Sequence, residues 1–377
     1  MLFRSYRSML LDFSEFSRKN QTTSTLGELG EPKFEMDGRA VNEWWARPQN
    51  DGPALRAIAL IRLAWGLLEE GREAEVWKLY DGKLPTSSVI KADLEYVSHH
   101  WKELCFDLWE ELKGDHFYTL MVQRRALKEG ALLANELGDE GAAAWYEKEA
   151  DEISERIEDF WNAKKGVMVP TLDRKEGVEY KTADLDSAII LGALHGDTED
   201  GFFSPSDDRL LSTLFHLEAS FKDLYAINKQ HPSLGVAIGR YPEDQYFGGN
   251  PWVLTTLGYA EFYYRLAAEY YTAGEIHLTD LNLDFFKELL KDTHIVLESG
   301  RVVTLSEALF YVITVKLRRR GDTFLDRVQA HALSDGSLFE QIDKENGEML
   351  SAADLSWNYA AFLTTVWARD VALKNEE

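Results

Sequence analysis

Four long segments of this sequence are apolar on almost every face of a helix, and this feature restricts the folds open to the chain. They are residues 54–70, 117–137, 252–271 and 354–373. A helix without a polar face has to be covered by neighbours on all sides. The sequence therefore predicts that these four helices lie in the interior of the fold.

Amphipathic helices alternate with the four apolar segments. In residues 142–160, apolar side chains recur at steps of three and four residues, namely Tyr146, Ala150, Ile153 and Ile157. Two concentric helical rings would require such an alternation of buried and half-buried helices, so an all-α fold is predicted. Strand signals are weak, and residues 166–172 and 297–305 are expected to form short hairpins. No linker divides the chain, which predicts a single domain over residues 1–377.

Net charge and cysteine content exclude several classes of function. The 377 residues include 65 acidic and 41 basic side chains, which gives a formal charge of −24. This charge repels phosphate backbones and anionic lipid surfaces, so neither nucleic acid nor a membrane is expected as a partner. No apolar run approaches the ~20 residues of a membrane span. The single cysteine, Cys105, excludes an internal disulfide and leaves open a reducing compartment or a large secreted protein.

The unusual residues are concentrated in four loops, each of which precedes an apolar helix. The loops span residues 43–53, 107–114, 239–252 and 335–357. They combine acidic residues with tryptophan or arginine, and they meet at one end of the ring if the inner helices are parallel. The chain also contains 11 Trp, 16 Tyr and 19 Phe. A surplus of tryptophan suits a site that grips flat, weakly polar rings such as sugars.

Two of these loops allow a structural as well as a functional interpretation. In loop 43–53, Asp51 is expected to cap the following helix, with Pro53 in its first turn. The stretch DLWEEL at residues 107–112 contains three acids within six residues. It is either a solvated helix end or a carboxylic acid that acidic neighbours keep protonated.

Four blocks of the sequence together resemble a known enzyme family. They are LGEPKFEMDGRAVNEWWARPQNDGPALRA (29–57), DLWEELKG (107–114), GRYPEDQYFGGNPW (239–252) and GSLFEQIDKENGEMLSAADLSWNYAA (336–361). In this order they resemble the glucoamylases of glycoside hydrolase family 15, which are exo-acting glucan 1,4-α-glucosidases. The resemblance implies an (α/α)6 toroid, in agreement with the two rings predicted from periodicity. It also implies an α-glucan substrate, no metal ion or cofactor, no separate starch-binding domain and a monomer.

The resemblance assigns two carboxylates to catalysis. The family inverts the anomeric centre, which requires a general acid and a general base about 6.5–9.5 Å apart. By motif, Glu110 resembles the acid and Glu340 resembles the base. Asp107 is a rival for the base, ranked second because it stands three residues before Glu110. Together with Glu111, Asp107 is expected to keep the acid protonated by like-charge repulsion and to bind sugar hydroxyls.

The remaining positions of the motifs imply a set of sugar-binding side chains. Trp45 resembles the tryptophan that lies against the bound sugar near the acid. The others implied are Arg47, Trp109, Glu111, Arg240 and Trp252. For Arg240, an ion pair with Glu243 or Asp244 is an equally good interpretation. Trp357 is expected to belong to the core.

The chain departs from the family pattern in places. The family usually has a glycine where Ala46 stands and a tyrosine where Val41 stands. The family also has an earlier segment whose arginine and aspartate hold the terminal glucose, and this sequence has no counterpart of it. The sequence therefore predicts a toroid without its first two helices, exposed apolar flanks and little turnover by this chain. A glucan-binding remnant and a truncated gene model are the alternatives. The compartment is open: secreted or vacuolar if a signal peptide preceded this start, intracellular otherwise.

Overall fold

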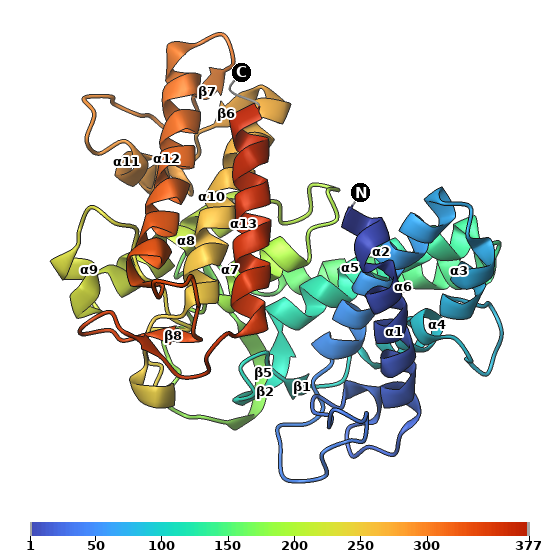
Figure 1. Ribbon diagram of the computed structural model, residues 1–377. Coiled ribbons are helices and arrows are strands. Elements are labelled where there is room, and N and C mark those ends of the chain that lie inside the picture. The colour runs from blue at the N-terminus through green and yellow to red at the C-terminus, as the bar shows by residue number, and fades with distance from the viewer. Residues whose placement is uncertain (1, 375–377) are drawn as a thin grey trace. The chain divides into compact units, whose positions relative to one another are not determined.

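The structure, a computed structural model, describes residues 2–374 and consists mainly of helices with a few short strands (Figure 1). It divides into two compact units. The N-terminal unit comprises residues 1–160, 171–178 and 195–200, and the C-terminal unit comprises residues 161–170, 179–194 and 201–377. Within residues 2–374, no helix is both long enough and apolar enough to cross a bilayer. The expectation of a single domain stays a prediction.

The N-terminal unit is built around two of the predicted apolar helices, α2 (Asp51–Glu69) and α5 (Phe117–Glu136). These helices pack on each other, and α6 (Glu140–Glu158) packs along α5. The apolar stripe predicted for α6 is buried, which confirms the amphipathic helix. The other helical elements described in this unit are α1 (Leu2–Thr22), η1 (Glu28–Gly30), α3 (Glu73–Leu79) and α4 (Val89–His100).

A small antiparallel sheet in the N-terminal unit supports the DLWEEL stretch. Its strands are β1 (Cys105–Phe106), β2 (Leu112–His116) and β5 (Thr171–Gly177), in the order β1-β2-β5. Residues 107–111 connect β1 to β2, so the sheet fixes both ends of this connection. Cys105 in β1 is buried, and its removal from water raises the pKa of the thiol to about 12.

The C-terminal unit contains the other two apolar helices, α10 (Val253–Ala273) and α13 (Ser356–Lys374). Both pack against α12 (Ala308–His331), and the three run side by side in Figure 1. The other helical elements described here are α7 (Ala188–His195), α8 (Asp208–Lys222), α9 (Ala226–Gln230), η2 (Tyr246–Gly248) and α11 (Leu283–Leu289).

The short strands of the C-terminal unit form two-stranded pairs. They are β3 (Trp161–Asn162) with β4 (Val167–Met168), β6 (Glu275–His277) with β7 (Val302–Thr304), and β8 (Gln341–Ile342) with β9 (Met349–Leu350). The predicted hairpins within residues 166–172 and 297–305 are therefore wrong. Each segment contains strand residues, but the pairing partners come from elsewhere in the chain.

Helix α13 is less buried than its sequence predicts. One face, which includes Asn358, Thr365 and Ala368, is buried, whereas Leu363 is 68% and Trp367 is 59% exposed. The buried face packs on α10 and α12. The prediction that α13 is covered on all sides is wrong for the part of the chain that the structure describes. An exposed apolar flank was expected, and α13 has one.

Candidate active site

The β1–β2 connection together with Leu112 (residues 107–112), here called the Glu110 loop, is held by Asp107. This residue is buried, and its Oδ1 accepts hydrogen bonds from the backbone N–H groups of Glu111 (2.7 Å) and Leu112 (2.9 Å). Its backbone N–H donates to the carbonyl of Leu112, and its carbonyl accepts from the N–H of Glu110. A carboxylate that bonds two amides of its own loop determines the loop's shape. In the structure, Asp107 thus positions Glu110, and its predicted roles as rival base and sugar ligand stay predictions.

Glu110 has a backbone conformation that non-glycine residues rarely adopt. Its φ angle is 65°, in the left-handed region, and its side chain is exposed. This conformation costs roughly 1–2 kcal/mol for an L-residue. Strain of this kind persists only where surrounding contacts enforce it, and it is common at functional sites. The hydrogen bonds of Asp107 supply that enforcement.

Gly177 of β5 closes the other side of the Glu110 loop. It pairs with Leu112, and it has a φ angle of 116°. A Cβ atom at this position would lie 2.0 Å from the carbonyl oxygen of Glu111. Only glycine therefore lets β5 approach the Glu110 loop this closely.

Gly177→Ala is expected to lower the free energy of unfolding by about 1–3 kcal/mol, because it adds a clash to an unfavourable φ angle. It is also expected to displace the Glu110 loop. Gly138→Ala is the matched control, because Gly138 has a φ angle of 80° but open space around its Cβ position. Urea denaturation of both variants measures the difference. Equal losses of stability would contradict the close approach of β5.

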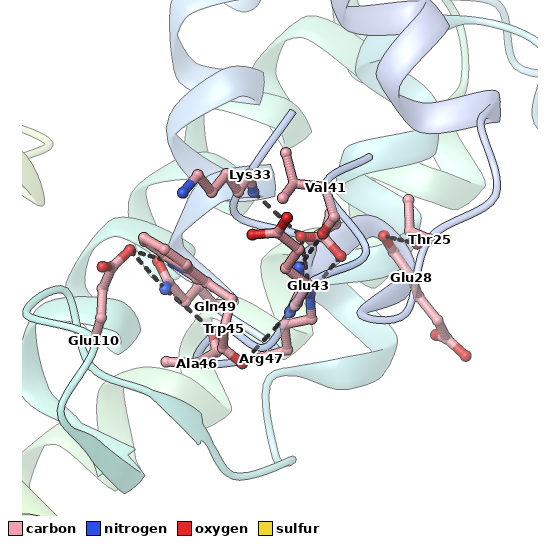
Figure 2. Close-up of polar contacts among 11 residues, drawn as sticks. Thr25, Glu28, Lys33, Val41, Glu43, Trp45, Ala46, Arg47, Gln49 and Glu110 are labelled. Carbon is pink, nitrogen blue, oxygen red and sulfur yellow. Dashed lines mark hydrogen bonds and ion pairs between the residues drawn. The ribbon is translucent and has the colours of Figure 1, made fainter. Parts of the chain in front are cut away.

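Two side chains from loop 43–53 grip the Glu110 carboxylate (Figure 2). The indole Nε1 of Trp45 donates to Oε1 at 2.9 Å, and the amide Nε2 of Gln49 donates to the same oxygen at 3.1 Å. The ammonium of Lys33 lies 3.5 Å from the centroid of the Trp45 ring, a cation–π contact. Within residues 2–374, Oε2 of Glu110 has no hydrogen-bond partner.

Arg47 holds the loop that carries Trp45. Its guanidinium forms a buried ion pair with Glu31, with Nε 2.7 Å from Oε2. It also donates to the carbonyls of Val41 and Glu43, as Figure 2 shows. These contacts occupy most of its donors. The prediction that Arg47 binds sugar stays a prediction, whereas its observed contacts stabilise the loop.

Asp51 begins α2 but does not cap it. The N-cap residue is Asn50, and no side chain makes a capping hydrogen bond there. The Oδ1 of Asn50 instead accepts from the hydroxyl of Tyr96. The expected cap is therefore wrong, whereas Pro53 does lie in the first turn. Removal from water raises the pKa of Asp51 to about 6, with smaller contributions from the negative charges of Asp107 and Glu110.

Asp51→Asn is expected to raise stability at pH 7. A carboxyl whose folded-state pKa is raised from 3.8 to about 6 disfavours the folded state when it ionises. This cost is absent below about pH 4, grows between about pH 4 and 6, and reaches on the order of 2–3 kcal/mol above pH 6. Urea denaturation at pH 4 and pH 7 should show a gain in the variant only at pH 7. An equal gain at both values would refute the ionisation cost.

Glu340 lies at the start of a second structured segment, residues 340–351, here called the Glu340 hairpin. Its Oε2 accepts from Nε2 of Gln341 at 3.0 Å and from the hydroxyl of Ser351. Its backbone carbonyl accepts from the N–H of Val253, one of the unsatisfied donors at the start of α10. Within residues 2–374, Oε1 of Glu340 has no hydrogen-bond partner. The hairpin therefore holds this carboxylate by one oxygen.

Arg240 forms the buried ion pair that the sequence allowed as one of two interpretations. Its partner is Asp244, with Nη2 2.6 Å from Oδ1, and both side chains are at most 3% exposed. The guanidinium carbon lies 5.0 Å from the ring centroid of Tyr246 and 5.5 Å from that of Trp252. Glu243 instead bonds the backbone of residues 182 and 183. An aromatic cage thus surrounds Arg240, and its contact with sugar stays a prediction.

Trp252 links this cage to the Glu340 hairpin. It forms an isolated antiparallel bridge with Gln341, the neighbour of Glu340. Asn250 adds a second link, because its Nδ2 donates to Oε1 of Gln341 at 3.2 Å. Loop 239–252 and the Glu340 hairpin are therefore one structured surface within the C-terminal unit.

Comparison with known proteins decides the family. The model for glycosyl hydrolases family 15 matches residues 6–367.

The chain belongs to glycosyl hydrolases family 15.

Curated proteins named glucoamylase are similar to this chain. Glucoamylase 1 of Rhizopus oryzae is 39% identical over 369 residues, which are 96% of this chain and 59% of that protein. Glucoamylase of Blastobotrys adeninivorans is 35% identical over 99% of this chain and 61% of its own length. The chain thus spans about three fifths of the length of these relatives.

Solved structures of glucoamylases match the fold. The glucoamylase from Hypocrea jecorina has a TM-score of 0.87 at 33% identity, over 96% of this chain and 60% of that one. The glucoamylase from Saccharomycopsis fibuligera also has a TM-score of 0.87, at 30% identity, over 98% of this chain and 81% of that one. They confirm the predicted fold class, the all-α toroid of glucoamylases.

The structure brings together only some of the residues predicted from the family motifs. Trp45 contacts Glu110 directly, while Trp109 and Glu111 lie in the Glu110 loop, the former buried and the latter half-buried. In the C-terminal unit, Arg240 and Trp252 are in contact. The separation of Glu110 and Glu340 stays a prediction, as does each assigned role.

Three contributing residues were missed from the sequence. Glu31 pairs with Arg47, Gln49 bonds Glu110, and Ser351 bonds Glu340. Glu31 and Gln49 both lie within the block 29–57 of the family motif, which was the available signal. Ser351 lies within the block 336–361 and is otherwise an ordinary loop serine. Trp357, expected in the core, is half-buried.

Proposed function

We propose that this protein hydrolyses α-1,4-glucosidic bonds of starch, glycogen or maltooligosaccharides, and that it releases glucose from non-reducing ends with inversion. Glu110 is the general acid and Glu340 is the general base. The observation that carries the proposal is the geometry of Glu110. Its carboxylate is exposed, its backbone is in the left-handed region, and one carboxylate oxygen accepts two hydrogen bonds. The relatives named glucoamylase support the substrate class.

The contacts of Glu110 suit proton donation from a defined atom. Both Trp45 and Gln49 donate to Oε1, and a protonated carboxyl keeps its hydrogen on the other oxygen. When Glu110 acts as the acid, its proton is therefore on Oε2, from which it can pass to the glycosidic oxygen. Fixing the donor atom in this way contributes to the rate by orientation.

The contacts of Glu340 suit proton acceptance in the same way. Gln341 and Ser351 donate to Oε2, so Oε1 can accept a proton from a water molecule. Inversion requires this water to attack the face of the sugar opposite the leaving oxygen.

Glu340→Gln is expected to lower glucose release from maltoheptaose by about 10²-fold or more, because water then lacks its base. Azide should restore turnover in this variant, because an anionic nucleophile needs no deprotonation, and the product should be β-glucosyl azide. Glu110→Gln is the matched control and should not respond to azide. Mass spectrometry and proton NMR of the products measure both variants. A Glu340 variant that azide leaves inactive would remove Glu340 from the role of base.

Glucan binding without turnover is the second candidate function. The observation that favours it is the exposure of Trp44, Tyr246 and Phe247, because exposed aromatic rings can bind sugar without any catalysis. Calorimetric titration with acarbose and an assay of glucose release separate the two candidates. Binding with release of β-glucose supports hydrolysis, and binding without release supports the second candidate. Failure to bind either acarbose or maltoheptaose would contradict both.

A further inference from the structure

A cavity of about 400 Å³ lies in the C-terminal unit, away from the loops described above. It is bordered by α8, α11 and α12, with one side chain of α10 at its base. None of its lining residues belongs to loop 239–252 or to the Glu340 hairpin. Its volume falls within the range of ~300–1,000 Å³ typical of small-molecule sites. Among residues 2–374, none of the residues that line it is hydrogen-bonded to Glu110 or Glu340.

The base of the cavity is aromatic and fixed. Tyr263 is 4% exposed and Phe285 is 3% exposed, and their rings stack with centroids 6.0 Å apart and an interplanar angle of 18°. The hydroxyl of Tyr263 donates to Oε2 of Glu218 at 2.7 Å, which fixes the ring from its polar end. Phe215 of α8 contributes a third ring to the lining. Such a base accepts a flat apolar group.

The rim of the cavity is basic in a protein whose formal charge is −24. Five basic side chains line it, against three acidic ones. The basic residues are Lys222, Lys291, Lys316, Arg319 and Arg320. The cavity therefore has an excess of positive charge although the whole chain is negative. This local excess attracts anions.

The acidic side chains are already paired. Glu218 forms an ion pair with Arg320. Burial lowers the pKa of Arg320 to about 10. Lys291 lies 2.5 Å from Glu288, and Lys316 lies 2.5 Å from Asp292.

Arg319 is the exception at the rim. It is exposed and has no ion-pair partner within residues 2–374. An unpaired guanidinium has donors available for a carboxylate, which it can bind through two parallel hydrogen bonds.

We propose that this cavity binds a small aromatic carboxylate. The flat ring lies against Tyr263, Phe285 and Phe215, and the carboxylate bonds Arg319 at the rim. A neutral sugar brings no anion to Arg319, and inorganic phosphate has no flat apolar group to contact the aromatic base. The combination of an aromatic base and an unpaired arginine therefore selects an anion with an apolar ring.

Calorimetric titration of the full chain tests this with 2-naphthoate, its neutral analogue 2-naphthamide, and inorganic phosphate. We expect 2-naphthoate to bind at least tenfold more tightly than either of the others, because a charge-assisted hydrogen bond is worth about one to two powers of ten. Arg319→Gln should weaken 2-naphthoate about tenfold and leave 2-naphthamide unchanged. Lys164→Gln removes the same charge from an exposed position outside the cavity and should change neither affinity.

A second pair of variants tests the location. Ala219 is an exposed position of α8 that lines the cavity. Ala219→Trp should fill the cavity and abolish binding of 2-naphthoate, whereas Ala219→Ser should retain it. Equal affinity for 2-naphthoate and 2-naphthamide, binding that survives Ala219→Trp, or no binding at all would each overturn the proposal.

Discussion

Glu110→Gln is expected to lower kcat for glucose release by about 10²–10⁴-fold, in a form of the protein that releases glucose, while glucan affinity changes little. The amide keeps the shape of the side chain, and its oxygen can still accept from Trp45 and Gln49. It has no acidic proton for the leaving oxygen. Cleavage through an oxocarbenium-like transition state depends strongly on that proton.

The kinetic measurement needs a control for the change of charge. Glu136→Gln provides one, because Glu136 is an exposed residue at the end of α5. Its kcat should match that of the parent protein. Calorimetry with acarbose should show similar affinities for all three proteins. Undiminished kcat in Glu110→Gln would refute the acid role and leave the left-handed turn at this residue without a catalytic explanation.

Arg47→Ala is expected to lower the free energy of unfolding by about 3–5 kcal/mol, because it leaves the carboxylate of Glu31 buried and unpaired. The exposed fractions of the two side chains are 9% and 0%. Arg39→Ala is the matched control, because its ion pair with Asp37 is exposed and solvent screens the attraction, so little stability should be lost. Urea denaturation of the two variants measures the contrast.

A double-mutant cycle separates the ion pair from the other contacts of Arg47. Adding Glu31→Ala to Arg47→Ala should cost less than the sum of the single changes, because the buried charge is removed together with its partner. The loop that carries Trp45 should also loosen, so the affinity for acarbose should fall. Additive losses would show that Glu31 and Arg47 do not act as a pair.

The helices of this protein were predictable because burial follows the period of the helix. Segments 117–137 and 252–271 are apolar on all faces, and they form the buried helices α5 and α10. The same pattern predicted the burial of α13 wrongly. An apolar sequence shows that burial of a face is favourable, but it does not show which element packs against that face. Leu363 and Trp367 are exposed for that reason.

The site was only partly predictable because its geometry depends on backbone turns. The motif identified Glu110, but the φ angle of 65° is set by hydrogen bonds to Asp107 that have no periodic signal. Likewise, the sequence placed an arginine beside Trp45 but did not show that Glu31, sixteen residues earlier, pairs with it. The motif therefore predicted that Arg47 binds sugar, whereas the contacts in the structure stabilise the loop that carries Trp45.

The chemistry of the single cysteine makes the chain convenient for site-specific spectroscopy. Cys105 is buried and its thiol has a pKa of about 12, so almost none of it is the reactive thiolate near neutral pH. Maleimide spin labels should therefore leave the parent protein unmodified. New cysteines at exposed Lys83 and Lys164 would place one label on each unit without any need to remove Cys105. Double electron–electron resonance could then follow the distance between the two units during glucan titration.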